Sequence, residues 1–126
     1  MDEKYNVGLV KHLGMRLVEV TPERAVGELE IRAELLTLGA ALHGGTLMAL
    51  ADTVGAMGTV AALKPGQRTA TIESKTNFFA AGRSGIVRAE STPLHKGRRT
   101  QVWQTRVTDD AGKLLSLTIQ TQAVLE

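Results

Sequence analysis

The sequence predicts an α+β fold in which one curved antiparallel sheet wraps around a single long central helix. Three observations support this prediction: an apolar helical stretch covers 44–63, two alternating segments precede it, and four β-type segments follow it. A helix that is apolar on nearly every side must be covered on several sides, which a curved sheet does. The curvature leaves part of the helix uncovered, so a partner subunit is expected.

The elements follow from turn and cap signals. A short helix is expected over Val7 to Leu13, and Thr21-Pro22-Glu23-Arg24 is the turn of the first hairpin. The long helix closes at Lys64-Pro65-Gly66, and Asp109-Asp110-Ala111-Gly112-Lys113 is a strong turn in the second half. The expected strands are Met15 to Val20, Ala25 to Ala33, Arg68 to Phe79, Gly85 to Pro93, Arg98 to Thr108 and Leu114 to Leu125, with 35–42 irregular.

Composition excludes several classes of protein. A length of 126 residues indicates one domain, 1–126, and 15 basic against 13 acidic side chains leave a net charge of +2. That excess is too small, and aromatic residues at 3% are too few, for a nucleic-acid-binding protein. The chain has no cysteine, hence no disulfide framework and no thiolate nucleophile. His and acidic residues do not cluster at ligand spacing, so no metal is expected.

The segment from Leu35 to Leu63 is long enough to raise the question of a membrane span, but it contains His43, Asp52 and several glycines. We therefore expect a protein with no membrane association. Three of the first five residues are charged, and the start does not resemble a secretory signal, which favours a cytoplasmic location.

Asp52 is the one ionised side chain between Glu34 and Lys64, in the middle of the apolar helix. A carboxylate is expensive to bury without a partner, and helix propensity does not favour Asp there. Either a hydrogen-bond partner compensates for the burial, or the unusual environment of Asp52 serves its function.

His43-Gly44-Gly45 directly precedes the helix, where open backbone N–H groups at the positive end of the helix dipole suit an anion or a developing oxyanion. Asp52 lies eight residues after Gly44, about 12 Å along the axis. A carboxylate and an oxyanion donor that act on one carbonyl must lie much closer together than this. Two antiparallel helices related by a two-fold axis meet that requirement, which predicts a homodimer with shared sites.

A stripe of small residues, Ala51, Gly55, Gly58 and Ala62, runs along the same helix. Each helical glycine is disfavoured by roughly 1 kcal/mol relative to alanine, so another group must approach closely there. Two interpretations remain open: packing of the helix on the sheet, and a helix–helix contact between two subunits.

The motif His43-Gly44-Gly45 followed by Leu50-Ala51-Asp52 resembles the hotdog-fold acyl-CoA thioesterases, most closely the phenylacetate-degradation type within the 4-hydroxybenzoyl-CoA thioesterase family. The resemblance runs from about Leu13 to Leu125. It includes Thr71-Ile72-Glu73 leading into Asn77-Phe78-Phe79, then Gly97-Arg98-Arg99-Thr100 and the turn at 110–113.

This resemblance implies a hotdog fold and hydrolysis of an acyl-CoA, with Asp52 as general base on water or as nucleophile. It implies that the Gly44 N–H polarises the thioester carbonyl and that the Thr71 hydroxyl holds the water or the carboxylate. His43 would hold the loop in shape, and Gly45 either contacts the substrate or only eases the turn into the helix. Coenzyme A is part of the substrate, so no separate cofactor is expected.

The chain departs from the family at two positions. Relatives often read Asn-x-x-Gly-x-x-His-Gly-Gly, where this chain has Thr37 and Ala40. The Asn is often assigned to substrate or water positioning, and Thr37 offers one hydroxyl in place of an amide. This departure bears on rate and substrate preference more than on reaction class.

The remaining candidates for substrate contact are basic or apolar. The turn His95-Lys96-Gly97-Arg98-Arg99 is either a solvated hairpin loop or a clamp on the phosphates of coenzyme A. Arg83 is a weaker candidate for the same role. The acyl pocket could be lined by Met48, Phe78 and Phe79, although core packing explains these residues equally well.

Two other functions compete with thioester hydrolysis. A hotdog-fold enoyl-CoA hydratase or dehydratase would pair His43 with Asp52 for proton transfer, and a non-catalytic acyl-CoA-binding module would use the same pocket without turnover. The resemblance also implies a homotetramer built from two of the expected dimers.

Overall fold

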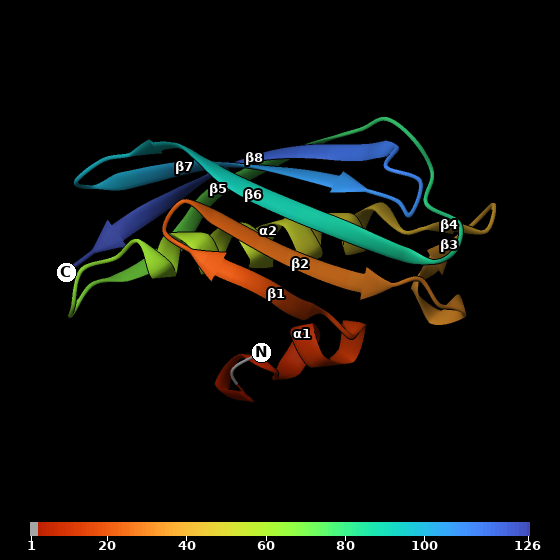
Figure 1. Ribbon diagram of the computed structural model, residues 1–126, viewed down its shortest axis with the longest axis horizontal. Coiled ribbons are helices and arrows are strands. Elements are labelled where there is room, and N and C mark those ends of the chain that lie inside the picture. Colours follow the sequence, from red (N-terminus) through yellow and green to blue (C-terminus); the bar gives the residue numbers. More distant parts are fainter. Residues whose placement is uncertain (1–2) are drawn as a thin grey trace.

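The computed structural model describes residues 3–126. In this range a six-stranded antiparallel sheet curves around one long helix, α2 (Gly44–Ala61) (Figure 1). The strand order is β1-β2-β6-β7-β8-β5, so that β1 and β5 form the two edges of the sheet. The predicted α+β architecture of a curved sheet around a central helix is therefore confirmed.

The elements follow the predicted order of two strands, one long helix and four strands. They are the 3₁₀ helices η1 (Glu3–Tyr5) and η2 (Ala33–Leu35), the helices α1 (Gly8–Leu13) and α2, and the strands β1 (Arg16–Thr21), β2 (Arg24–Glu30), β3 (Leu36–Thr37), β4 (Ala41–Leu42), β5 (Arg68–Phe78), β6 (Ile86–Lys96), β7 (Thr100–Thr108) and β8 (Leu114–Leu125).

The bounds differ from the prediction where the backbone is irregular. β2 ends at Glu30 instead of Ala33, because the chain turns there towards η2. β6 runs past Pro93, which has no N–H to donate, because its pairing with β7 shifts between Pro93 and His95. The segment 35–42, predicted to be irregular, contains the short hairpin of β3 and β4.

The side of α2 that faces the sheet changes character along the helix. Its first half packs on an apolar core that includes Leu47, Leu50 and Val54, together with Leu29 and Leu115 from the sheet. The second half covers a polar layer in which the buried side chains are Ser91, Gln101, Thr105, Thr118, Gln120 and Gln122. Buried polar groups need hydrogen-bond partners, so this layer is held together by side-chain contacts between strands.

The glycines of the small-residue stripe pack on this polar layer. A Cβ atom at Gly55 would lie 2.0 Å from Oε1 of Gln120, and one at Gly58 would lie 2.5 Å from the Trp103 ring. Both partners are fully buried side chains of the sheet. For these two glycines, packing of the helix on the sheet is therefore the correct interpretation.

Replacing Gly58 by alanine should lower the free energy of unfolding by about 1–2 kcal/mol, although alanine is the better helix former. The added methyl group would force the buried Trp103 indole to move. Urea denaturation of the variant and the parent measures the change, and an equal or higher stability of the variant would contradict the packing described.

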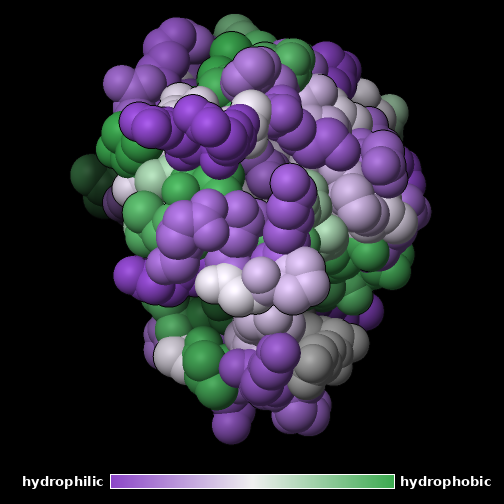
Figure 2. Space-filling model, turned by 90° about the vertical axis from the view of Figure 1, so that its left-hand side faces the viewer, coloured by the Kyte–Doolittle hydropathy of each residue, from purple (hydrophilic) through white to green (hydrophobic). Residues whose placement is uncertain are grey.

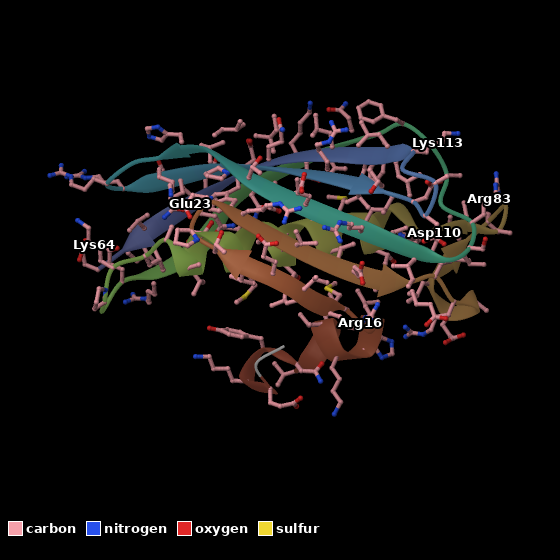
Figure 3. The ribbon with its side chains drawn as sticks, in the orientation of Figure 1. Arg16, Glu23, Lys64, Arg83, Asp110 and Lys113 are labelled. Atoms are coloured by element: carbon pink, nitrogen blue, oxygen red, sulfur yellow. The ribbon has the colours of Figure 1, made fainter. Side chains whose placement is uncertain are left out.

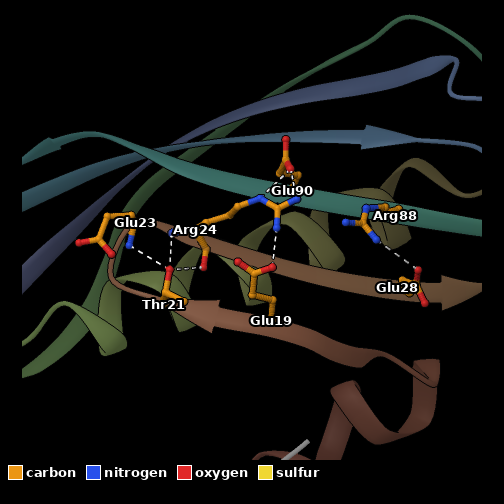
Figure 4. A network of polar contacts seen from close by, with 7 residues as sticks. All are labelled: Glu19, Thr21, Glu23, Arg24, Glu28, Arg88 and Glu90. Atoms are coloured by element: carbon orange, nitrogen blue, oxygen red, sulfur yellow. Dashed lines mark hydrogen bonds and ion pairs between the residues drawn. The ribbon is translucent and has the colours of Figure 1, made fainter.

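An ion-pair network lies on the face of the sheet that points away from α2 (Figure 4). Arg24 donates to Glu90 on β6 and, at 2.5 Å, to Glu19 on β1, and these carboxylates raise the pKa of the Arg24 guanidinium, Glu90 most strongly. Nearby, Arg88 pairs with Glu28 at 3.7 Å. Because successive side chains of a strand point to opposite faces, this network ties β1, β2 and β6 together without touching the helix side.

Candidate active site

The carboxylate of Asp52 lies at the junction of α2, β5 and β8. The side chain is partly buried, and its Oδ1 accepts hydrogen bonds from the Thr71 hydroxyl at 3.2 Å and from Nε2 of Gln120 at 3.4 Å. Gln120 also donates to the main-chain oxygen of Asp52 at 3.3 Å. Within residues 3–126 no Lys, Arg or His forms an ion pair with Asp52, so neutral donors hold this charge.

Thr71 reaches Asp52 from the edge strand β5. The pairing of β5 with β8 shifts between Thr71 and Glu73, and the extra residue, Ile72, is 61% exposed. Such a bulge turns the side chains that flank it. The Thr71 hydroxyl in turn accepts a hydrogen bond from Nε2 of Gln122 at 2.7 Å. The structure thus brings together two of the predicted site residues, Asp52 and Thr71.

Gln120 and Gln122 were not predicted from the sequence. A signal for them exists in β8, where Ser116, Thr118, Gln120 and Gln122 alternate with more apolar residues. Here the polar side of the strand is the buried side. An unusually polar strand face beneath an apolar helix therefore marks the surroundings of the carboxylate.

The start of α2 holds the second group of predicted site residues. Nδ1 of His43 caps the helix by accepting the Gly45 N–H at 2.7 Å, which agrees with a role of His43 in shaping the loop. The Gly44 N–H has no acceptor among the described residues. It lies at the positive end of the helix dipole, an environment that favours an anion or a carbonyl oxygen.

An exposed aromatic ring, that of Phe78, lies next to Gly44. The Phe78 ring lies 3.2 Å from where a Cβ of Gly44 would sit, so any larger residue would press on this ring. Phe78 and Phe79 are 50% and 57% exposed, and Met48, one helical turn after Gly44, is 38% exposed. None of the three is a core residue of the chain in this structure.

The loop before His43 contains both departures from the family pattern, Thr37 and Ala40. Ala40 has a φ of 56°, a left-handed conformation that glycine adopts without strain. Thr37 is exposed and pairs with Ala41 in the short hairpin. Arg83 braces this loop by donating to the main-chain oxygen of Gly39 at 2.7 Å.

The basic turn lies at the opposite end of the molecule from Arg83, near the label of Lys64 in Figure 3. Lys96, Gly97 and Arg98 line a pocket of about 410 Å³ together with Lys64 and Gln67 from the loop between α2 and β5. Nζ of Lys96 also donates to the main-chain oxygen of Pro22 at 3.0 Å. Figure 2 shows that the surface at this end is largely hydrophilic, with separate hydrophobic patches.

Within one chain the two halves of the candidate site stay apart. Gly44 and Asp52 belong to the same continuous helix, so their separation of eight residues corresponds to about 12 Å along the axis. No group of three or more acidic or histidine side chains in the described range is placed to hold a metal ion. Nor does this range contain a helix long and apolar enough to cross a membrane.

Comparison with known proteins identifies the family of this chain. Residues 39–116 match the model of the thioesterase superfamily. The 1,4-dihydroxy-2-naphthoyl-CoA hydrolase of Listeria monocytogenes is 31% identical over 118 residues, 94% of this chain and 96% of that protein. The chain belongs to the thioesterase superfamily and is a thioester hydrolase.

Two solved structures extend the comparison. The thioesterase HI1161 of Haemophilus influenzae superposes with a TM-score of 0.94 and 26% identity over 99% of this chain and 87% of that one. The PaaI protein from the phenylacetic acid degradation operon of E. coli has a TM-score of 0.89 at 22% identity, over 98% of this chain and 88% of that one, and shares the fold. The predicted resemblance to the hotdog-fold thioesterases is therefore confirmed.

Proposed function

We propose that this enzyme hydrolyses an aryl, arylacetyl or medium-chain acyl-CoA at sites shared between two subunits. Asp52 of one protomer would act together with the Gly44 N–H of its partner. One observation carries this proposal. In the described residues the Asp52 carboxylate is held only by neutral donors, and the Gly44 N–H, which has no acceptor, lies about 12 Å away on the same helix. Neither group completes a site within its own chain.

The bare edge of β5 supports the dimer. β5 is an 11-residue strand that, within residues 3–126, pairs only with β8, and an exposed strand of this length is rarely left uncovered. A second β5 added antiparallel at this edge would continue the sheet and bring the two α2 helices side by side. The homotetramer, as a pair of such dimers, is proposed from the family resemblance alone.

The chemistry follows from the positions of these groups. As general base, Asp52 takes a proton from water, and the water oxygen attacks the thioester carbonyl carbon. The carbonyl oxygen gains negative charge, which the partner's Gly44 N–H stabilises at the positive end of a helix. Collapse of the intermediate breaks the carbon–sulfur bond, and the thiolate takes up a proton to give free coenzyme A and the acid.

The alternative is that the Asp52 carboxylate attacks the carbonyl carbon itself, giving a mixed anhydride that water then hydrolyses. Both routes place Asp52 and Gly44 on the same carbonyl and give the same products. Each uses water and the protein groups already named, with coenzyme A entering as part of the substrate. Such a substrate fits a cytoplasmic enzyme.

Two surfaces would receive the rest of the substrate. The exposed side chains of Met48, Phe78 and Phe79 would surround the acyl group next to Gly44. The Listeria relative is named for an aromatic acyl group, which supports an aromatic substrate. The pocket lined by Lys96 and Arg98 offers cationic donors for the coenzyme A phosphates.

A substrate panel tests the proposal. Benzoyl-, phenylacetyl-, naphthoyl-, hexanoyl- and crotonyl-CoA would be assayed for release of free thiol, with loss of the enoyl absorbance followed for crotonyl-CoA. We expect thiol release with the highest kcat/KM on an aromatic or medium-chain substrate. Hydration of crotonyl-CoA without thiol release would establish the hydratase alternative, and binding without turnover across the panel would establish the binding module.

A further inference from the structure

Two glutamines buried beneath α2 take no part in the catalytic steps proposed so far. Gln120 and Gln122 are fully buried on β8, where a primary amide is expensive to place unless its hydrogen bonds are satisfied. Both connect to Asp52, Gln120 directly and Gln122 through Thr71. Because both amides are buried beside the Asp52 carboxylate, each one can affect its position.

The direction of each hydrogen bond follows from the charge on Asp52. An ionised carboxylate only accepts, so the single proton of the Thr71 hydroxyl points to Oδ1 of Asp52. The Thr71 oxygen is then free to accept, and it does so from Nε2 of Gln122 at 2.7 Å. The other end of this amide, Oε1, lies 3.0 Å from the Thr69 hydroxyl, whose single proton is shared with the main-chain oxygen of Ala123 at 2.7 Å. Gln122 therefore fixes both the position and the direction of the Thr71 hydroxyl.

Gln120 fixes the same carboxylate from the side of the helix. Its Nε2 lies within 3.4 Å of both the main-chain oxygen and Oδ1 of Asp52. Its Oε1 is buried with no partner among the described residues, in the space left by the missing side chain of Gly55. An unsatisfied buried acceptor lowers the stability of the fold, so the benefit of placing Gln120 here must come from the bonds that its Nε2 makes to Asp52.

As a result, the two oxygens of the Asp52 carboxylate differ in their hydrogen bonding. Oδ1 receives donors from Thr71 and Gln120, whereas Oδ2 receives no hydrogen bond from any residue of the described range. The anchored oxygen cannot turn towards a substrate without breaking these bonds. Oδ2 is thus the oxygen left for reaction.

Resting on the proposed function of Asp52, we propose that Gln122 is a positioning residue that acts through Thr71. Together with Gln120 it holds Oδ1 of Asp52 and leaves Oδ2 to act on water or on the thioester carbon. Because Gln122 does not touch the substrate, its loss should affect kcat and leave KM nearly unchanged. Because it acts through Thr71, its effect should vanish when the Thr71 hydroxyl is absent.

A double-mutant cycle tests this inference. Gln122→Met keeps the length of the side chain and removes both hydrogen-bonding ends. We expect kcat to fall about 10- to 100-fold with KM within about twofold, since a small misplacement of a reacting group has effects of this order. In the Thr71→Ala background the same substitution should change kcat by less than about twofold, because contacting residues are not additive.

The matched control is Thr105→Val, which removes one buried hydroxyl of the same polar layer. Thr105 bonds to Ser91 and has no bond to Asp52 or Thr71 in the described structure. We expect it to lower thermal stability while kcat stays within about twofold of the parent, which separates loss of packing from loss of positioning.

Gln122→Glu is the second variant in case Gln122→Met does not fold. A glutamate at 122 accepts the hydroxyl proton of Thr71, so this proton no longer points to Asp52 and kcat should again fall. A folded variant of either kind with the parental kcat, or an equal loss with and without Thr71, would overturn the inference. An active Asp52→Asn enzyme would instead overturn the proposed function, so the two failures are distinguishable.

Discussion

Replacing Asp52 by asparagine should reduce kcat by about 10²- to 10⁴-fold, the range that a positioned general base supplies. Asparagine has nearly the same shape, and its side-chain oxygen still accepts from Thr71 and Gln120, so the fold should persist. The amide takes up no proton from water and is a poor nucleophile, so both proposed routes fail. Thiol release from the best acyl-CoA, with thermal unfolding as a check on folding, measures the effect.

Asp110→Asn is the matched control for this substitution. Asp110 is exposed in the turn between β7 and β8, its Oδ1 accepts the Ile86 N–H at 3.1 Å, and it has no bond to Asp52 or Thr71 in the described structure. We expect its kcat to stay within about twofold of the parent, as is usual for surface changes outside a site. An Asp52→Asn enzyme with the parental rate on a good substrate would refute the assigned role of the carboxylate.

The second large effect is expected from Gly44→Pro, which deletes the N–H proposed to stabilise the oxyanion. Loss of one such donor should reduce kcat by about 10²- to 10³-fold. The backbone should tolerate the change, because proline suits the first helical position. His43, with φ −59° and ψ 134°, already has the conformation favoured before proline.

Gly44→Ala controls for the contact with Phe78. It places a carbon at the same 3.2 Å from the ring while keeping the N–H. The ratio of kcat between the alanine and proline variants therefore reports the replacement of the N–H by the proline ring, with the contact of Cβ on Phe78 common to both. If both variants lose the same activity, crowding of Phe78 and not loss of the donor explains the result.

Much of the fold could be predicted because its local patterns agree with its tertiary structure. On β7 the side chains of Val102, Gln104, Arg106 and Thr108 share one face, which is more exposed than the alternate positions, including the fully buried Trp103. The long helix starts where His43 and Gly44 predict it. These elements follow from periodicity and capping, which are properties of short segments.

The polar layer could not be predicted because β8 inverts the usual pattern. The usual pattern, with apolar side chains facing the core and polar ones facing solvent, places Leu117 and Ile119 in the core and Gln120 outside. Instead Ile119 is 39% exposed and Gln120 is fully buried. The inversion makes sense only once Asp52 is known to lie above this strand, which is a relation between elements far apart in the sequence.

Asp52 itself illustrates the same limit. The sequence marks it as an isolated charge, and the family resemblance links it to Thr71, but neither indicates the amides that complete its surroundings. The glycine stripe was likewise ambiguous, since a gap left by glycine can receive a strand or a helix. Only the positions of Gln120 and Trp103 decide that the sheet occupies it.

The central claim is that Asp52 of one subunit works beside Gly44 of the other, and complementation between two inactive variants tests it most directly. Asp52→Asn and Gly44→Pro subunits would be unfolded together at equal amounts, refolded, and assayed for thiol release. Half of the resulting dimers pair one variant with the other, and each of these has one intact site of two. The account predicts recovery of about a quarter of the parental activity. A mixture as inactive as either variant alone, with subunit exchange verified by mass spectrometry, would contradict it.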